Sequence, residues 1–196
     1  MSELFGSNWG HSFFKYKACD FCDDVVGETA DISVGDAWLP EYVSDSAGTN
    51  VVVVRSQVLN SILADAAASG RLHLDSIPAE KVVESQAGGF RHRRDGLAYR
   101  LFVEDQAGRW RPTKRVTPSV THLTPKLREI YALRYELGHA SHAAFASAKV
   151  KNDFGFFLQI MNPLTARYDR YYRRSLILRI LGKIKRIIIS FGRRQH

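Results

Sequence analysis

The fold is decided by the stretch GTNVVVVRSQVLNSILADAAASG, which occupies residues 48–70. Its first three residues are a turn signal. The valines 51–54 predict a short buried strand, because β-branched residues favour strands and no polar residue interrupts the run. Ser56 has the side chain of a helix N-cap, and apolar residues recur at helical spacing through residues 57–69. Gly70 suits the left-handed position that ends many helices. The stretch therefore predicts a strand followed by an amphipathic helix.

The sequence on either side of this stretch extends the pattern. Residues 71–74 predict a returning strand, which would complete a strand–helix–strand unit. Upstream, Ile32 and Val34 alternate with polar residues, as in a half-buried strand, and this strand should end at Gly35 and Asp36. We therefore expect an α+β fold, with a mixed sheet and flanking helices.

The segment that follows is harder to assign. Pro78 predicts the start of a short helix, and Gly88 and Gly89 are expected to break it. Residues 97–103 fit either a helix or a strand. Three prolines make residues 108–125 a loop.

The C-terminal part of the chain predicts a helical, basic extension. The chain is therefore expected to divide into a domain over residues 1–120 and an extension over residues 121–196. Asn162 and Pro163 should end one of the helices of the extension, because proline interrupts helical hydrogen bonding. The last expected helix is basic and amphipathic. From apolar spacing, the expected helices lie within residues 127–137, 140–150, 154–160 and 171–189.

Charge is distributed unevenly along the 196-residue chain. The net charge is +8, but residues 1–54 hold nine Asp and Glu against two Lys, so this block carries −7 and the remainder +15. A basic body suits phosphate-bearing cofactors, nucleic acid, anionic lipid or an acidic protein. No helix-turn-helix, zinc-finger, RRM or OB motif is present in the sequence, which argues against nucleic acid as the partner. The basic C-terminal helix suits an anionic membrane surface.

The sequence also bears on the compartment. It contains no apolar run of roughly 20 residues, which a membrane span requires, and residues 1–10 do not resemble a secretory signal. We expect a cytoplasmic protein, with the C-terminal helix as a peripheral contact at the inner membrane face. In that compartment two cysteines more often bind metal or do redox work than form a structural disulfide.

The two cysteines, Cys19 and Cys22, stand three positions apart in the run CDFCDD. Two thiolates at this spacing can reach one metal ion or one edge of an iron–sulfur cluster, because the short loop directs both sulfurs inward. Such a site normally takes four protein ligands, so one copy of this chain supplies half of a Cys₄ set. Two ordinary loop cysteines are the alternative. Gly35 and Asp36 also allow two interpretations. They could contact a ligand at the end of a strand, or form a turn in which the Asp36 side chain hydrogen-bonds its own backbone.

Eight cationic residues gather in a later part of the chain. Arginine can hold a phosphate with two hydrogen bonds, so this cluster could bind the tail of a flavin or deazaflavin. A solvated surface is the alternative. The residues are Arg91, Arg93, Arg94, Arg100, Arg109, Arg111, Lys114 and Arg115.

The run KACDFCDDVVGETADISVGDAWLPEY, followed by GTNVVVVRS, resembles the C-terminal domain of the coenzyme F-420 hydrogenase/dehydrogenase beta-subunit family. That family shows Cys-x-x-Cys-x-Asp, then Ala-Asp-Ile-Ser-x-Gly, then a Gly-rich turn before a Val/Ile strand ending in Arg. The resemblance covers about residues 9–110. Within it, GDAW at 35–38 and the stretch at 85–101 are similar to a bacterial branch of the family found among polysaccharide-biosynthesis genes.

The resemblance implies an oxidoreductase component that uses FAD and a 4Fe-4S cluster, with coenzyme F-420 as a further candidate. It makes Cys19 and Cys22 candidate cluster ligands. The remaining candidates are residues of the cofactor pocket, namely Asp31, Gly35, Asp36 and Arg55. It assigns no catalytic residue.

Members of this family are usually longer, and their N-terminal half supplies further cysteines and part of the flavin site. We therefore expect this chain to be incomplete alone, with a second subunit supplying the remaining cluster ligands. The leading hypothesis is a component of a flavin/iron–sulfur oxidoreductase that transfers electrons or hydride. The alternative is a non-catalytic remnant or interaction module, associated with the membrane surface in polysaccharide biosynthesis.

Overall fold

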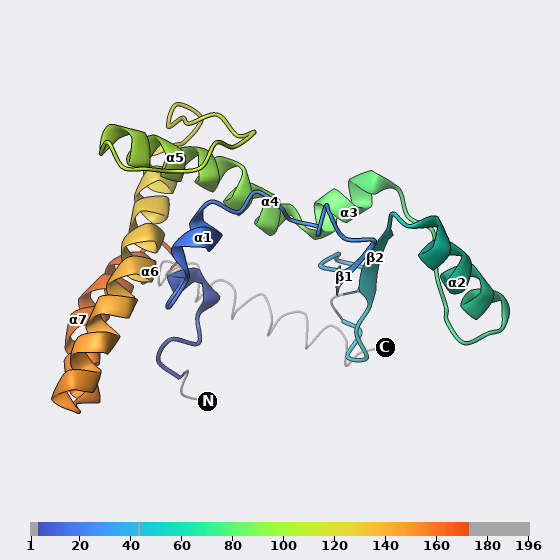
Figure 1. Ribbon diagram of the computed structural model, residues 1–196. Coiled ribbons are helices and arrows are strands. Elements are labelled where there is room, and N and C mark those ends of the chain that lie inside the picture. The colour runs from blue at the N-terminus through green and yellow to red at the C-terminus, as the bar shows by residue number, and fades with distance from the viewer. Residues whose placement is uncertain (1–3, 43, 173–196) are drawn as a thin grey trace, which may run out of the picture. The chain divides into compact units, whose positions relative to one another are not determined.

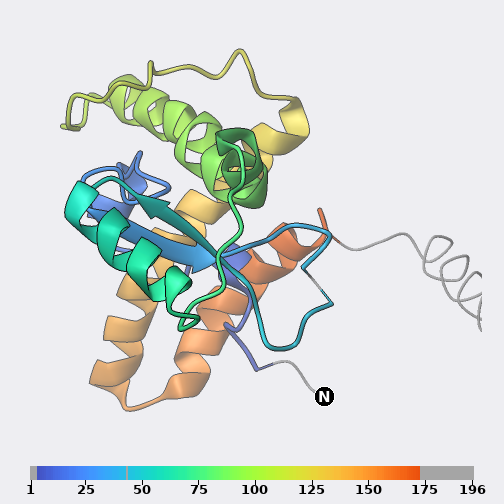
Figure 2. The same cartoon turned by 90° about the vertical axis from the view of Figure 1, so that its right-hand side faces the viewer.

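The computed structural model describes residues 4–42 and 44–172, which form two compact units (Figures 1 and 2). The sheet unit consists of residues 16–124. The helical unit combines residues 4–15 with residues 125–172. The first residues of the chain thus fold with the C-terminal helices. The expected α+β class with flanking helices is confirmed.

The sheet consists of two antiparallel strands, β1 (Ile32–Asp36) and β2 (Asn50–Val54) (Figure 1). Both strands were predicted from the sequence. Their register places Ser33 opposite Val53 and Gly35 opposite Val51. In β2, Val51 alone is buried, so the expectation of a strand buried on both faces was wrong. In the part of the chain that the structure describes, the sheet has only these two strands.

Helix α2 (Gln57–Ala68) follows β2 as the sequence predicted. The side chain of Ser56 caps it, because its Oγ accepts a hydrogen bond from the backbone N–H of Leu59. Gly70 has a positive φ of 71°, which a glycine adopts without steric cost, so the chain can turn away there.

The strand predicted at residues 71–74 is absent, and this prediction was wrong. The backbone N–H groups of Arg71 and Leu72 both donate to the carbonyl of Ala66, in the last turn of α2. These donors therefore serve the end of the helix and are not available for a strand ladder.

Three helices complete the sheet unit: α3 (Ala79–Ser85), α4 (Ala87–Arg93) and α5 (Asp95–Gln106). Pro78 is the N-cap of α3, as predicted. Gly88 and Gly89 do not break a helix, because α3 has already ended and both glycines lie within α4. A Cβ at Gly89 would approach Val25 to 3.0 Å, so this glycine permits a close helix–loop contact. The ambiguous residues 97–103 are helical.

The helical unit is an antiparallel pair, α6 (Pro125–Lys151) and α7 (Phe154–Asp169), joined by a short turn (Figure 2). Two separate helices were expected over α6, but the helix continues through Gly138. A side chain there would crowd the carbonyl of Ser12, at 3.3 Å from the Cβ position, so packing against the N-terminal segment favours glycine. The expected end before Pro163 was also wrong. Buried residues on both sides of this proline, Met161 and Thr165, keep the helix in place.

The core of the helical unit lies between α6 and α7. The N-terminal segment closes it, since Nε2 of His11 lies 2.9 Å from Oδ1 of Asp169 in α7. The short helix η1 (Trp9–His11) carries this histidine. The buried core residues are Ile130, Leu133, Leu137, Ala144, Ala148, Phe157, Met161 and Tyr168.

The basic helix expected over residues 171–189 lies almost entirely outside the described residues. Within the described ranges, no helix combines the length and the apolar character that crossing a membrane would demand.

Replacing Leu137 with alanine should lower the free energy of unfolding by about 2–5 kcal/mol, because the side chain is fully buried and a cavity would remain. The control is Val150→Ala, since Val150 lies at the exposed end of α6. Urea unfolding followed by circular dichroism measures both. A loss at Leu137 no larger than the loss at Val150 would contradict this core assignment.

Candidate functional site

The cysteine pair sits on one turn of chain that begins in the short helix α1 (Lys17–Asp20). The backbone N–H of Cys22 donates to the carbonyl of Cys19 at 3.4 Å, and the N–H of Cys19 donates to Tyr16 at 2.9 Å. A hydrogen bond between residues three apart keeps their α-carbons within about 7 Å. Cys19 is exposed, Cys22 is half-buried, and both are free thiols. The sequence-predicted ligands are therefore close together and accessible. We call residues 19–22 the cysteine turn.

The side of the cysteine turn that faces α5 is fixed by a buried polar contact. Nε of Arg100 donates to the carbonyl of Asp20 at 2.7 Å, and the Arg100 side chain also reaches the carbonyl of His92. Arg100 is 3% exposed. Burying a guanidinium costs free energy unless its N–H groups find acceptors. The hydrogen bond to the carbonyl of Asp20 supplies one acceptor, and it holds Asp20 in place.

A buried carboxylate supports the same turn from α5. Glu104 is fully buried, and the guanidinium of Arg109 donates to both of its oxygens, at 2.9 and 3.0 Å. Nζ of Lys17 lies 3.6 Å from Glu104, so the first residue of α1 is tied to the same group. Phe21 adds apolar contact with α5. Because Lys17, Asp20 and Phe21 are directed toward α5, Cys19 is left on the open side.

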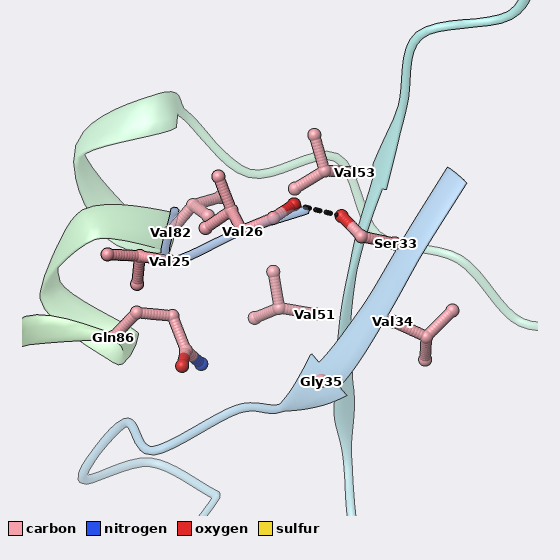
Figure 3. Close-up of a pocket in the computed structure, with 9 residues that line it drawn as sticks. All are labelled: Val25, Val26, Ser33, Val34, Gly35, Val51, Val53, Val82 and Gln86. Carbon is pink, nitrogen blue, oxygen red and sulfur yellow. Dashed lines mark hydrogen bonds between the residues drawn. The ribbon is translucent and has the colours of Figure 1, made fainter. Parts of the chain in front are cut away.

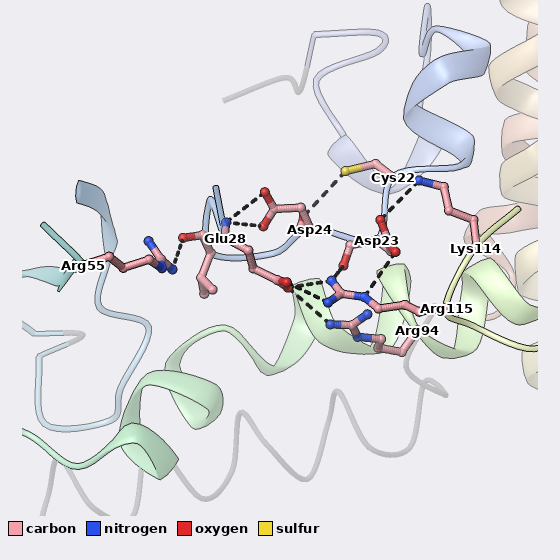
Figure 4. Close-up of polar contacts among 9 residues, drawn as sticks. Cys22, Asp23, Asp24, Glu28, Arg55, Arg94, Lys114 and Arg115 are labelled. Atoms are coloured by element: carbon pink, nitrogen blue, oxygen red, sulfur yellow. Dashed lines mark hydrogen bonds and ion pairs between the residues drawn. The ribbon is translucent and has the colours of Figure 1, made fainter. Parts of the chain in front are cut away.

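The acidic residues that follow the cysteine turn are held by ion pairs (Figure 4). Asp23 contacts Lys114 Nζ and Arg115 Nε, both at 3.2 Å. Glu28 contacts Arg115 at 2.7 Å and Arg94 at 3.4 Å. The network joins the segment after the cysteines to the loop that follows α5.

These contacts shift the protonation of the two carboxylates. Burial alone would raise the pKa of Asp23, but the hydrogen bond from Lys114 and the charges of Lys114 and Arg115 lower it. The hydrogen bond from Arg115 is the main cause that lowers the pKa of Glu28. Asp24 joins the network differently, since both of its carboxylate oxygens accept from the backbone N–H of Glu28, at 3.0 Å.

Most of the cationic cluster at positions 91–115 is used inside the sheet unit. Arg94, Lys114 and Arg115 hold Asp23 and Glu28. Three further members are engaged in other contacts, with a backbone carbonyl or a nearby carboxylate. These members are Arg100, Arg109 and Arg111. Six of the eight cations thus have partners within the protein, which favours a structural role over phosphate binding.

The residues predicted for a cofactor pocket lie in β1 or next to the ends of β1 and β2. The guanidinium of Arg55 donates to the carbonyls of Val26 and Ala30, both at 3.1 Å, and its backbone N–H donates to Asp31. Arg55 therefore holds the loop before β1 against the end of β2. The backbone carbonyl of Asp36 accepts a hydrogen bond from Nε2 of Gln86 at 2.8 Å.

A small hollow lies on the face of the strand pair that carries Ser33 and Val51 (Figure 3). Its volume is about 60 Å³. Gly35 lines it, and the hydroxyl of Ser33 is directed to the carbonyl of Val26, at 2.6 Å. Because cofactor sites usually enclose about 300–1,000 Å³, this hollow does not fit a flavin ring. The residues that line it are Val25, Val26, Ser33, Val34, Gly35, Val51, Val53, Val82 and Gln86.

A larger cavity of about 560 Å³ lies between β2, α2 and the segment after α2. Its walls combine apolar side chains with polar and acidic ones, namely Tyr42, Asp45, Thr49, Asn50, Asn60, His73 and Asp75. Its volume and its mixed lining fit a flavin ring. Sequence reasoning missed this cavity, because the residues that line it are spread over several segments between residues 37 and 77.

The residues present fit only part of a 4Fe-4S site. The chain contains two cysteines. Across residues 4–42 and 44–172, no group of three or more His, Cys, Asp or Glu is arranged to hold a metal ion. One copy of the chain therefore offers two thiolates for a cluster that normally takes four ligands.

A family model matches residues 3–80 of the chain, and its description is the C terminus of the beta subunit of coenzyme F420 hydrogenase/dehydrogenase. The matched segment contains the cysteine turn, both strands and α2, and it ends near the start of α3. Searches of the curated proteins and of the solved structures found no match.

Replacing Arg100 with methionine should destabilise the sheet unit by about 1–3 kcal/mol, because the buried carbonyl of Asp20 would lose its donor. Arg91→Met is the matched control, since Arg91 lies exposed on α4. Chemical denaturation measures both variants. Equal stability of the two would show that the buried contact does not anchor the cysteine turn.

The ion pairs of Asp23 and Glu28 predict a loss of stability in acid. Both carboxylates have lowered pKa values in the folded chain, so their contribution is present above the ordinary values of 3.8 and 4.5 and disappears as the pH falls through the folded values. Arg115→Gln should lower stability slightly at pH 7, because its ion pairs with Asp23 and Glu28 lie at the surface and are screened by solvent. The difference from wild type should persist below the ordinary values of 3.8 and 4.5 and shrink as the pH falls through the lowered pKa values of Asp23 and Glu28. Denaturation midpoints of both proteins, measured from pH 7 into this acid range, give the difference in stability. A difference that does not change with pH would contradict the ion pairs of Asp23 and Glu28 as its cause.

Proposed function

We propose that this chain, whose residues 3–80 belong to the family defined by the C terminus of the coenzyme F420 hydrogenase/dehydrogenase beta subunit, is a redox component that carries electrons or hydride. The observation that supports the proposal most directly is the cysteine turn. Cys19 and Cys22 share one turn and are both accessible, while Arg100 and Glu104 fix the other side of that turn to α5.

In this proposal Cys19 and Cys22 provide two thiolate ligands of an iron–sulfur cluster. The other ligands come from a second polypeptide, because one chain has two cysteines. The cluster supplies a one-electron relay when it is bound. The protein's own task is to hold both thiols at one accessible surface. The buried contacts of Arg100 and Glu104 serve that task by limiting movement of the turn.

The cavity beside β2 is the proposed flavin site, since its volume suits the ring and its amides can hydrogen-bond a polar edge. A bound flavin supplies hydride exchange, which amino-acid side chains do not. The resemblance implies Asp31, Gly35, Asp36 and Arg55 as residues of the cofactor pocket, but none of them lines this cavity, so their proposed role is to position the strands beside it. Their observed contacts join the ends of β1 and β2, and β2 forms one wall of the cavity.

The proposed setting is the cytoplasm, where thiols stay reduced and two cysteines suit metal binding. The basic C-terminal sequence, residues 173–196, is proposed to meet an anionic membrane surface at the inner face. It contains eight Lys and Arg and no Asp or Glu.

Anaerobic reconstitution of the full chain with ferrous iron and sulfide tests the metal role. A small thiol such as glutathione, added in excess, can supply the ligands that one chain lacks. With it, the wild-type chain should gain the visible absorbance of an iron–sulfur cluster, together with bound iron and sulfide. Cys19→Ser/Cys22→Ser should bind only background iron, because both protein ligands are gone.

His139→Ala is the control, since it removes a possible metal ligand from the helical unit and should leave the absorbance unchanged. Absence of a cluster in the wild-type chain, or equal iron in the double serine variant, would overturn the metal role.

A further inference from the structure

An aromatic groove of about 400 Å³ lies in the helical unit. Apart from Gly6, only phenylalanines line it, and they come from the N-terminal segment, α6 and α7. We call this feature the aromatic groove. Its phenylalanines are Phe5, Phe13, Phe14, Phe145, Phe154 and Phe157.

The groove is built by specific contacts. The ring of Phe157 stacks with Phe14 at 6.0 Å and with Phe154 at 5.4 Å between centroids. Phe14 has a positive φ of 57°, which is rare for a bulky residue and persists only where its surroundings hold it. Its backbone N–H donates to Oγ of Ser141 in α6 at 2.8 Å. The fold thus maintains an unfavourable backbone conformation that places this ring at the groove.

Phe154, which lines the groove, begins α7, and Val150 lies in the last turn of α6. Phe154 is 57% exposed and Val150 is 89% exposed, although both are apolar. Leu4 is also exposed, next to Phe5 in sequence. A small-molecule site normally includes a few polar side chains that orient its ligand, and the side chains that line this groove are all apolar. The surface therefore fits a partner that is recognised by apolar burial.

Cationic residues accompany this surface. Lys149 and Lys151 occupy the last turn of α6, and Nζ of Lys151 lies 4.4 Å from the ring centre of Phe156. The acidic residue at the same turn, Asp153, accepts a hydrogen bond from the N–H of Gly155 and caps α7. The described part of the helical unit holds eight Lys and Arg against four Asp and Glu.

We propose that the aromatic groove and its exposed rim dock on an anionic lipid bilayer. Phe154 and Val150 enter the interface, while Lys149 and Lys151 meet the lipid phosphates. Apolar insertion combined with basic charge is the pairing that gives stable attachment of a peripheral protein. This inference rests on residues outside the redox proposal and does not depend on it.

Co-sedimentation of the full chain with vesicles tests the proposal. Vesicles of phosphatidylcholine alone are compared with vesicles that also contain phosphatidylglycerol, and the wild-type chain should bind only the anionic ones. Val150→Ser/Phe154→Ser should weaken binding by at least roughly tenfold, because two inserted side chains are lost. Val58→Ser, an exposed valine of α2 in the sheet unit, is the matched control and should bind as wild type does.

Two further variants separate the contribution of charge from that of the redox site. Lys149→Gln/Lys151→Gln should weaken binding and reduce its salt dependence. Cys19→Ser/Cys22→Ser should bind vesicles normally, so failure of the redox proposal would remain distinguishable. Circular dichroism confirms that each variant is folded.

Three results would overturn the proposal: no wild-type binding to anionic vesicles, equal binding to neutral vesicles, or unchanged binding of Val150→Ser/Phe154→Ser. Concentration-dependent dimerisation that the double serine variant abolishes would assign the groove to a second copy of the chain and would also overturn it.

Discussion

The hydrogen bond from the buried guanidinium of Arg100 to the carbonyl of Asp20 is the constraint on which the candidate site depends. Placing a guanidinium in the interior costs free energy unless its donors are satisfied, so the chain accepts this arrangement only in a well-defined geometry. Glu104, with Arg109 and Lys17, adds a second buried charge at the same junction. Both groups act on a turn whose opposite side carries Cys19 in solvent. The structure thus places buried, charged side chains on the side of the turn opposite Cys19.

The strand pair is stabilised in a different way, by side-chain contacts at the ends of its strands. Two strands alone are marginally stable in water, and here the ends of the strands are joined by side-chain contacts. Arg55 holds the entry loop through two carbonyls, and Gln86 holds the exit of β1 through the carbonyl of Asp36. These contacts leave the sheet partly open, with a small hollow lined by both strands and a large cavity beside β2. An open face of this kind leaves room for a cofactor or a further polypeptide to bind.

Much of the sheet unit follows from local sequence. The valine run, the Ser56 cap and the alternation at Ile32 and Val34 predicted β1, β2 and α2, because each signal acts over a few residues. The predictions failed where distant packing decided the outcome. Residues 71–74 have strand-like composition, but their donors complete the end of α2. Pro163 stays within α7 because the residues around it are buried against α6.

The candidate site divides in the same way. The spacing of Cys19 and Cys22 can be seen in the sequence, and both cysteines lie within the segment that the family model matches. The buried partners, Arg100 and Glu104, were hidden among charges that composition assigns to the surface. Only the fold shows which arginine of the cationic cluster points inward. The large cavity was missed because its lining is distributed over several separate segments.

The contact between His11 and Asp169 has a consequence for biosynthesis. It connects residues 158 positions apart, so the last turns of the final described helix must leave the ribosome before the first segment can dock. During translation the early phenylalanines of that segment therefore wait, uncovered, while the whole intervening polypeptide is made. A nascent chain of this kind is exposed to aggregation for longer than one whose neighbours in space are also neighbours in sequence, and it is a natural client for chaperones that shield apolar side chains.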